Sequence, residues 1–379
     1  MTATIEIPAA IRAVTAAQPA AQVALGAAVR SPSHAYLLAG PPGSGKRAAA
    51  RALVAELLAA GAEDPEDARR RALADPSPHP DLVWLRPPGA QHLVEVVRER
   101  VIAAAAYRPF EGERRAFVIE DADAMAEESQ NALLKTLEEP AAFAHLVLIS
   151  DEPEALLETV RSRCISVRFD RLAPDAVEAA LGDSGSVEER HAVARLAGGD
   201  VEQARFLLTD EGRALRSAVE ELIAAARSGD LSGSPWRALT EASDAAGELA
   251  ASELAARAAA AEEEAAERGA QATRRRAREA EEGAKRGARA ARTATLDLGL
   301  ALLASWLRDF AAVAEGVPEL ALNADRRAAI EATAEGVDSR RARRAAELVM
   351  DTRRRLTVNV SETLALEALT FRLEFLLNT

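Results

Sequence analysis

The stretch that decides the fold is residues 40–47, Gly-Pro-Pro-Gly-Ser-Gly-Lys-Arg. It follows the phosphate-binding pattern G-x-x-x-x-G-K-[ST] up to the last position. The glycines of this pattern let backbone N–H groups close around phosphate oxygens, and its lysine reaches the outer phosphates. We therefore predict a nucleotide-binding loop. Its residues are Gly40, Pro41, Pro42, Gly43, Ser44, Gly45 and Lys46.

The last position of the loop departs from the pattern, because Arg47 stands where a hydroxyl should ligate Mg²⁺. A guanidinium beside a divalent cation is repelled by about 4 kcal/mol per unit charge at about 4 Å, with an effective dielectric of about 20. Either Arg47 turns away, or the metal binds poorly. The loop keeps the architecture of a nucleotide site with weakened chemistry, so we expect ATP or ADP to bind weakly or not at all.

The residues around the loop favour an α/β domain. An apolar run at 35–39 precedes the loop and an alanine- and leucine-rich stretch at 47–60 follows it, which gives the strand, loop and helix order that the motif requires. Further apolar runs lie at 82–85, 116–119, 146–149 and 165–167. The stretches with helical periodicity between them are 93–105, 127–137 and 154–160. This alternation indicates a parallel sheet covered by helices.

One of the apolar runs ends in two carboxylates, Glu120 and Asp121. This is the Walker B position, at the strand edge where ligands sit in open α/β sheets. The usual order there in nucleotide hydrolases is Asp, for the metal's water, then Glu, as the catalytic base. The reversed order shortens the base by one methylene and moves its oxygen by about an ångström or more, which harms the positioning of the attacking water.

The chain divides by its pattern into three predicted domains. Strand signals stop after Asp170, short helical stretches follow, and everything from about 213 onward favours helix. We predict a nucleotide-binding-like domain over 1–170, a helical lid over 171–212 and an all-α collar, or oligomerisation domain, over 213–379.

A charged helical insertion is predicted within the collar at about 241–292. Residues 241–270 carry eight acidic and two basic side chains, whereas residues 271–292 carry eight basic and three acidic ones. One interpretation is a solvated helical hairpin with self-complementary charge. The other is a basic arm, containing three consecutive arginines at 274–276, that touches DNA or a partner.

The composition excludes several classes of protein. The 379 residues carry a net charge of −13, which argues against a monomer coated in nucleic acid. The single cysteine, Cys164, rules out an internal disulfide framework and a multi-cysteine zinc site. We expect it to be a small buried residue at a strand start rather than a nucleophile. The first residues lack the basic region of a signal peptide, and no apolar run reaches membrane-spanning length, so we expect a soluble cytoplasmic protein without a membrane partner.

Two further motifs give the chain a family resemblance. Residues 131–140 read Asn-Ala-Leu-Leu-Lys-Thr-Leu-Glu-Glu-Pro, and residues 162–164 read Ser-Arg-Cys. Residues 33–37 read Ser-His-Ala-Tyr-Leu, and residues 79–82 read His-Pro-Asp-Leu. Together these motifs resemble clamp-loader subunits of the AAA+ superfamily, and most of all the δ′ subunits of bacterial DNA polymerase III.

The resemblance is dense over residues 15–170 and thin in the C-terminal half, where only 296–309 and 359–373 are similar to the family's collar helices. It implies a RecA-like AAA+ domain, a helical lid and a collar that builds a ring of five subunits. Such a loader opens a sliding clamp and closes it on primed DNA. The partners implied are other clamp-loader subunits of γ/τ and δ type, the sliding clamp and, through the assembled complex, primer–template DNA.

The resemblance also implies roles for particular residues. Arg163 corresponds to an arginine finger, a cation supplied in trans to a neighbour's γ-phosphate, where it raises the rate by roughly 10³–10⁵. The alternative is that Arg163 only pairs with a surface carboxylate. Glu202 stands where motor subunits carry a phosphate-sensing arginine, and a carboxylate there would repel a triphosphate. Residues 61–68 lack the cysteines that family members commonly use for zinc, so we expect no metal.

These departures favour a finger donor over a motor subunit. We expect a component of a DNA polymerase holoenzyme without polymerase activity and with little or no ATPase activity. The alternatives are an ATP-hydrolysing γ/τ-like subunit, in which Arg47 is tolerated, and an AAA+ ATPase of DNA repair. A motor subunit should carry a hydroxyl after the lysine and Asp-Glu at the strand end, and this chain has neither.

Overall fold

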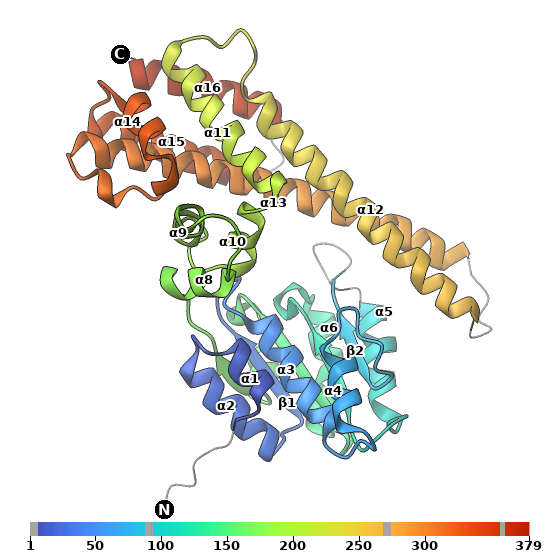
Figure 1. Cartoon of the computed structure of the whole chain (residues 1–379). Helices are drawn as coiled ribbons and strands as arrows, with labels where there is room; N and C mark the ends of the chain where they lie inside the picture. The colour runs from blue at the N-terminus through green and yellow to red at the C-terminus, as the bar shows by residue number, and fades with distance from the viewer. Residues whose placement is uncertain (1–6, 88–91, 93, 268–273, 357–360, 379) are drawn as a thin grey trace, which may run out of the picture. The chain divides into compact units, whose positions relative to one another are not determined.

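The structure is a computed structural model that describes residues 7–87, 92, 94–267, 274–356 and 361–378. The chain forms two compact units, Met1–Leu172 and Ala173–Thr379 (Figure 1). The separation of a lid from a collar within the second unit stays a prediction. The N-terminal residues that bear on a signal peptide, and residues 359–360 of the second collar motif, lie outside the described residues.

A five-stranded sheet forms the centre of the first unit. Its strands are β1 Ala35–Ala39, β2 Leu82–Leu85, β3 Arg115–Ile119, β4 Ala144–Ser150 and β5 Ile165–Arg168. Their spatial order is β2-β3-β4-β1-β5, and every pairing is parallel. The predicted strands and the P-loop α/β fold class are confirmed. Because β1 lies between β4 and β5, the phosphate loop that follows it lies at the carboxyl edge beside the end of β4.

Helices cover both faces of this sheet (Figure 1). They are α1 Ala9–Val14, α2 Pro19–Arg30, α3 Lys46–Ala59, α4 Pro65–Leu73, α5 Val94–Val97, α6 Glu127–Glu138 and α7 Glu158–Arg161. Side chains of β1 alternate between two cores: Tyr36 and Leu38 pack with α1, α2 and α3, whereas Leu37 and Ala39 pack with α6. A wholly apolar β1 is what burial on both faces requires.

The helix predicted at 93–105 is split in the structure. After α5 come a π-helix, Arg98–Ala103, and a 3-10 turn, Ala104–Ala106. Residue 93 itself lies outside the described residues. We have no physical account from the sequence for this change of helix type.

The helix predicted at 154–160 is also interrupted, and here the cause is visible. A 3-10 turn, Pro153–Ala155, precedes α7. Between them the side chain of Gln130 accepts a hydrogen bond from the N–H of Leu157 at 2.7 Å and donates to the carbonyl of Ala155 at 3.4 Å. A buried side-chain amide on α6 thus replaces the helical hydrogen bonds at this point.

A buried carboxylate holds the loop that precedes β3. Asp81, in the His-Pro-Asp-Leu motif, is fully buried and accepts the backbone N–H groups of Phe110 and Glu111, both at 2.8 Å. Nε of Arg115 lies 3.5 Å from the same carboxylate, and its guanidinium donates to the carbonyl of Tyr107 at 3.3 Å. The motif therefore has a structural role, because it fixes the chain as it enters β3.

The described part of the second unit is helical. Its helices are α8 Pro174–Leu181, α9 Val187–Leu196, α10 Val201–Leu207, α11 Asp210–Ser228, α12 Arg237–Glu267, α13 Arg274–Ala314, α14 Arg327–Ala334, α15 Ser339–Leu356 and α16 Glu362–Asn378. Trp306 and Phe310 of α13 are fully buried and contact each other edge-on. Beside them Asp309, also fully buried, accepts the N–H groups of Leu322 and Asn323 at 2.8 and 2.9 Å, so the connection after α13 is held by a satisfied polar group.

Helices α12 and α13 run side by side as a long hairpin (Figure 1). They approach closely at Gly247, where an added Cβ would lie 3.0 Å from the carbonyl oxygen of Ala288. Arg292 of α13 pairs with Asp244 of α12. The described helices agree with the hairpin interpretation of the charged segment.

The predicted bounds of the charged segment, 241 and 292, both fall inside these helices rather than at their ends. Ser243, within the segment, is fully buried. The base of the hairpin is therefore part of the packed helices, and a peripheral excursion stays a prediction for its outer part. Residues 271–273 of the proposed basic arm lie outside the described residues.

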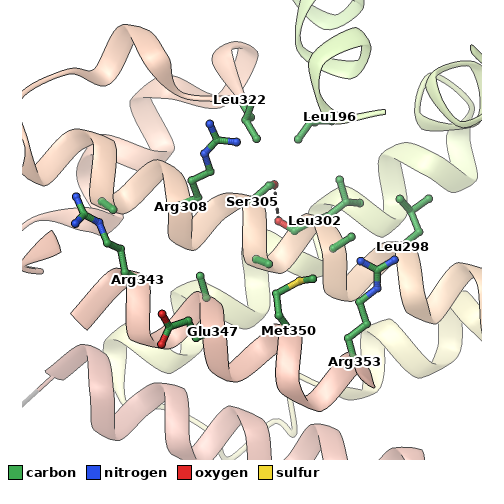
Figure 2. A pocket seen from close by; sticks show the side chains of 14 residues that line it. Leu196, Leu298, Leu302, Ser305, Arg308, Leu322, Arg343, Glu347, Met350 and Arg353 are labelled. Carbon is green, nitrogen blue, oxygen red and sulfur yellow. Dashed lines mark hydrogen bonds between the residues drawn. The ribbon is translucent and has the colours of Figure 1, made fainter. Parts of the chain in front are cut away.

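A groove of about 570 Å³ lies between α13 and α15 (Figure 2). Leu302 and Met350 contribute to its apolar lining, and three arginines, Arg308, Arg343 and Arg353, also line it.

Helix α16 presents a second apolar surface. Leu364, Phe371 and Phe375 are exposed, and their spacing of seven and four residues places them on one helix face. Large apolar side chains gathered on an exposed face mark a surface for protein contact.

Candidate functional site

The phosphate loop joins β1 to α3 and depends on two glycines. Gly40 approaches the end of β5 so closely that an added Cβ would lie 2.2 Å from the carbonyl oxygen of Phe169. Gly45 has a φ of 93° and forms the N-cap of α3, a conformation that favours glycine. The free N–H groups at the start of α3 therefore lie at this loop, where they favour an anion.

Lys46 is folded into the loop and is 4% exposed. Its Nζ donates to the carbonyl oxygens of Gly40 and Pro41, both at 2.6 Å. The same nitrogen lies 2.7 Å from a carboxylate oxygen of Asp151, which follows β4. A phosphate would have to compete with this carboxylate for the lysine.

Arg47 is folded over the strand-end carboxylates and does not turn away from them. Its Nε lies 2.5 Å from Oε1 of Glu120, and a terminal nitrogen lies 3.6 Å from Oδ1 of Asp121. Burial raises the pKa of the Asp121 carboxyl, and the charge of Arg47 opposes that rise. Of the two sequence expectations for Arg47, the one in which it turns away does not hold in this geometry, and poor metal binding stays a prediction.

Glu120 has further partners that the sequence reasoning missed. Nε1 of Trp84 donates to its Oε2 at 2.7 Å, and Nε of Arg86 donates to the same oxygen at 3.0 Å. A terminal nitrogen of Arg86 also pairs with Asp75 at 2.7 Å. His92 contacts the backbone carbonyl of Glu120 through Nε2 at 2.6 Å, and burial lowers the pKa of this histidine.

The register of the parallel strands explains why Arg86 lies beside Glu120. Leu85 is the partner of Ile119 across β2 and β3, so the residues that follow them, Arg86 and Glu120, lie beside each other at the carboxyl edge. Asp151 comes to the same edge because it directly follows β4. Both residues could have been predicted from the sequence by noting which residues directly follow neighbouring parallel strands.

Arg163 lies at the corner between α7 and β5. Its terminal nitrogens bond Oε1 of Glu138 at 2.6 Å and the carbonyl of Thr159 at 2.8 Å. The arginine side chain is 35% exposed and that of Glu138 is 50% exposed. The two family motifs therefore meet here, since Glu138 belongs to the motif at 131–140. Within one chain this is the surface ion pair that the alternative interpretation expects.

Glu202 and Cys164 have simple surroundings. Glu202 pairs with Arg205 at 2.8 Å on the exposed surface of α10 and belongs to the second unit. Cys164 is half-buried beside the core under α6. Burial raises the pKa of its thiol to about 12, so the reactive thiolate is strongly disfavoured near neutral pH.

The stretch 61–68 leads into α4 instead of forming a cysteine module. Asp64 caps this helix by accepting the N–H groups of Glu66 and Asp67. Across the described ranges, no cluster of three or more His, Cys, Asp or Glu side chains is arranged to bind a metal. Within those same ranges, every helix is too short or too polar to span a membrane. The expectation that the chain holds no zinc stays a prediction.

Residues 20–173 match a protein-family model described as DNA polymerase III, delta subunit. The chain is 40% identical over 139 residues to the DNA polymerase III subunit delta′ of Pseudomonas aeruginosa, covering 35% of this chain and 42% of that protein. It is 35% identical over 151 residues to the delta′ subunit of Bacillus subtilis, covering 38% and 45%. The matches thus span less than half the length of these curated relatives.

The chain is also similar to more distant proteins. The gamma/tau subunit of Mycobacterium tuberculosis is 31% identical over 169 residues, which is 39% of this chain and 26% of that protein. Among solved structures, a gamma subunit-related protein from Thermotoga maritima is 15% identical, with a TM-score of 0.44 over 93% of this chain and 98% of that chain. Both the identity and the score of that structural match are low.

Proposed function

From the similarity of residues 20–173 to δ′ subunits of DNA polymerase III, we propose that the chain is a δ′-like clamp-loader subunit that donates Arg163 in trans to a neighbouring ATPase in a clamp-loader ring. The proposal gives it partners of γ/τ and δ type. It acts on the sliding clamp and on primer–template DNA through the assembled complex. It works in the cytoplasm and hydrolyses little or no ATP itself.

The observation that carries this proposal is the weak attachment of Arg163. Its partner Glu138 is half exposed, and a surface ion pair contributes about 0–1 kcal/mol to stability. Exchanging Glu138 for the more highly charged γ-phosphate of a neighbour therefore costs little. A fixed cation at such a phosphate raises the rate of nucleotide hydrolysis by a factor of roughly 10³–10⁵.

The second support is the state of the chain's own phosphate loop. Lys46 is neutralised by Asp151, and Arg47 by Glu120. A magnesium–nucleotide complex would have to break both ion pairs before binding. We therefore propose that nucleotide binds here weakly or not at all.

The apolar surfaces of the second unit support assembly with neighbours. The groove between α13 and α15 is open, and Leu364, Phe371 and Phe375 of α16 keep exposed apolar surface. Replacing Phe371 and Phe375 of α16 by aspartate should weaken assembly of the ring in size-exclusion chromatography, because charges would replace exposed apolar side chains at the proposed contact. Unchanged assembly would show that this face of α16 is not used.

The function is tested by Arg163→Ala in a ring reconstituted with γ/τ- and δ-type subunits. Hydrolysis at one neighbouring site should slow by roughly 10³, while the ring forms normally. Arg161→Ala is the matched control, because Arg161 is a neighbouring arginine that pairs with Glu154. Equal turnover in the wild-type and Arg163→Ala rings would contradict the finger role.

The motor alternative is tested on the isolated chain. We expect negligible ATP hydrolysis, because the Lys46 and Arg47 ion pairs oppose magnesium–nucleotide binding and no neighbour supplies a finger. Magnesium-dependent turnover that Lys46→Ala abolishes would favour the motor interpretation over the proposed one.

A further inference from the structure

The carboxylate of Glu120 is bound on both of its oxygens. Oε1 pairs with Arg47 at 2.5 Å, and Oε2 accepts Trp84 at 2.7 Å and Arg86 at 3.0 Å. The carboxylate is 4% exposed, so solvent competes little for these positions. We call these four residues the Glu120 cluster.

Arg86 is held in the cluster independently of Arg47. Its terminal nitrogen pairs with Asp75 at 2.7 Å. The same Asp75 lies 3.2 Å from Arg51, whose guanidinium lies 4.3 Å from the ring centre of Trp84. Removing the side chain of residue 47 would therefore leave both donors on Oε2 in place.

These residues do not fit the Mg²⁺ that a phosphate loop implies. Mg²⁺ requires oxygen ligands in a near-octahedral arrangement, and phosphate-loop sites supply a hydroxyl after the lysine and a strand-end carboxylate. Here the hydroxyl position is the Arg47 guanidinium, and N–H donors occupy both oxygens of Glu120. The second strand-end acid, Asp121, lies 3.6 Å from that same guanidinium.

We propose that Arg47 and Arg86 are two resident cations that exclude divalent metal from this site, each sufficient without the other. The inference rests on the proposed function only in treating the chain as a subunit that does not hydrolyse ATP. Its consequence is specific. Arg47→Thr restores the phosphate-loop pattern in the sequence but does not restore metal binding, because Arg86 still holds Glu120. Both arginines must be replaced together.

The test measures Mn²⁺ binding in the presence of ATP by the electron paramagnetic resonance signal of the free ion. The full chain is compared as wild type, Arg47→Thr, Arg86→Gln and the double variant. We expect the double variant to bind Mn²⁺ with ATP at least about tenfold more tightly than wild type or either single variant. Arg69→Gln is the matched control, since Arg69 pairs with the buried carboxylate of Glu56 away from this site.

Folding of each variant is checked by circular dichroism and a cooperative melt. If Arg47→Thr/Arg86→Gln unfolds, Arg47→Thr/Arg86→Met keeps the aliphatic stem of residue 86 and tests the same point. A single variant that binds Mn²⁺ as tightly as the double variant overturns the inference. So does a folded double variant that gains no binding, or a wild-type chain that already binds Mn²⁺ with ATP.

These results are distinguishable from failure of the proposed function. A single variant equal to the double variant would end the two-cation inference, while the effect of Arg163→Ala on the ring would stand. Conversely, an Arg163→Ala ring with normal turnover would end the finger role without changing Mn²⁺ binding at the Glu120 cluster.

Discussion

Two corners of the first unit each hold an arginine against a glutamate, but in different surroundings. At the phosphate loop, Arg47 pairs with Glu120, which is 4% exposed and has two further donors. At the corner of α7 and β5, Arg163 pairs with Glu138, which is 50% exposed. Burial of the partner decides whether an arginine is fixed in its own chain or is available to another.

The largest difference should appear when each glutamate is removed. Glu120→Ala removes a buried carboxylate that accepts from Arg47, Trp84 and Arg86, so it should lower the free energy of unfolding by about 2 kcal/mol. Glu138→Ala removes a surface pair and should lower it by less than about 0.5 kcal/mol. Urea denaturation of both variants measures the contrast. Similar losses for the two would show that burial does not separate the two corners.

A smaller difference should appear with pH. Burial lowers the pKa of His92, which contacts Glu120, so its folded pKa lies below the unfolded value of about 6.5. Its contribution to stability is present above the unfolded pKa and is lost as pH falls from there through the folded pKa. His92→Gln should therefore reduce the loss of stability below about pH 6.5. Glu138→Ala should leave that pH dependence unchanged, and an equal effect of the two variants would contradict the assignment to the loop corner.

The smallest effect is expected far from both corners, in the outer hairpin of the second unit. Replacing residues 256–285 by a short Gly/Ser linker keeps the close approach of Gly247 and Ala288. The free energy of unfolding should change by less than about 1 kcal/mol. Removing all of 241–292 should lower the free energy of unfolding further. This deletion takes away Ser243, which is buried, and Arg292, which also pairs with Glu362. If both deletion variants melted cooperatively with the same free energy of unfolding, the base of the hairpin would lie outside the core.

The sequence predicted most of the first unit because its signals are local. The run at 35–39 is apolar throughout and flanks a glycine loop, so both its strand type and its burial on two faces could be inferred. The break at 154–160 could not, because it depends on Gln130, a residue more than twenty positions away that bonds into the gap. Helix periodicity contains no such information.

The sequence predicted only those residues of the candidate site that belong to a recognised motif. Gly45, Lys46, Glu120 and Asp121 lie in recognisable patterns, and the structure brings them to one sheet edge. The partners Arg86 and Asp151 lie in no motif, and only the pairing of parallel strand ends brings them there. The direction of Arg47 was left open for the same reason, since it depends on how well Glu120 is buried.

The most direct test of the account compares Arg163→Ala with Arg47→Ala in the same reconstituted ring. Single-turnover hydrolysis at the neighbouring site should fall by roughly 10³ for Arg163→Ala. It should stay at the wild-type rate for Arg47→Ala, because that arginine is held within its own chain. Unchanged hydrolysis with Arg163→Ala, or an equal loss with Arg47→Ala, would contradict the claim that the arginine paired with an exposed glutamate is donated and the arginine paired with a buried glutamate is not.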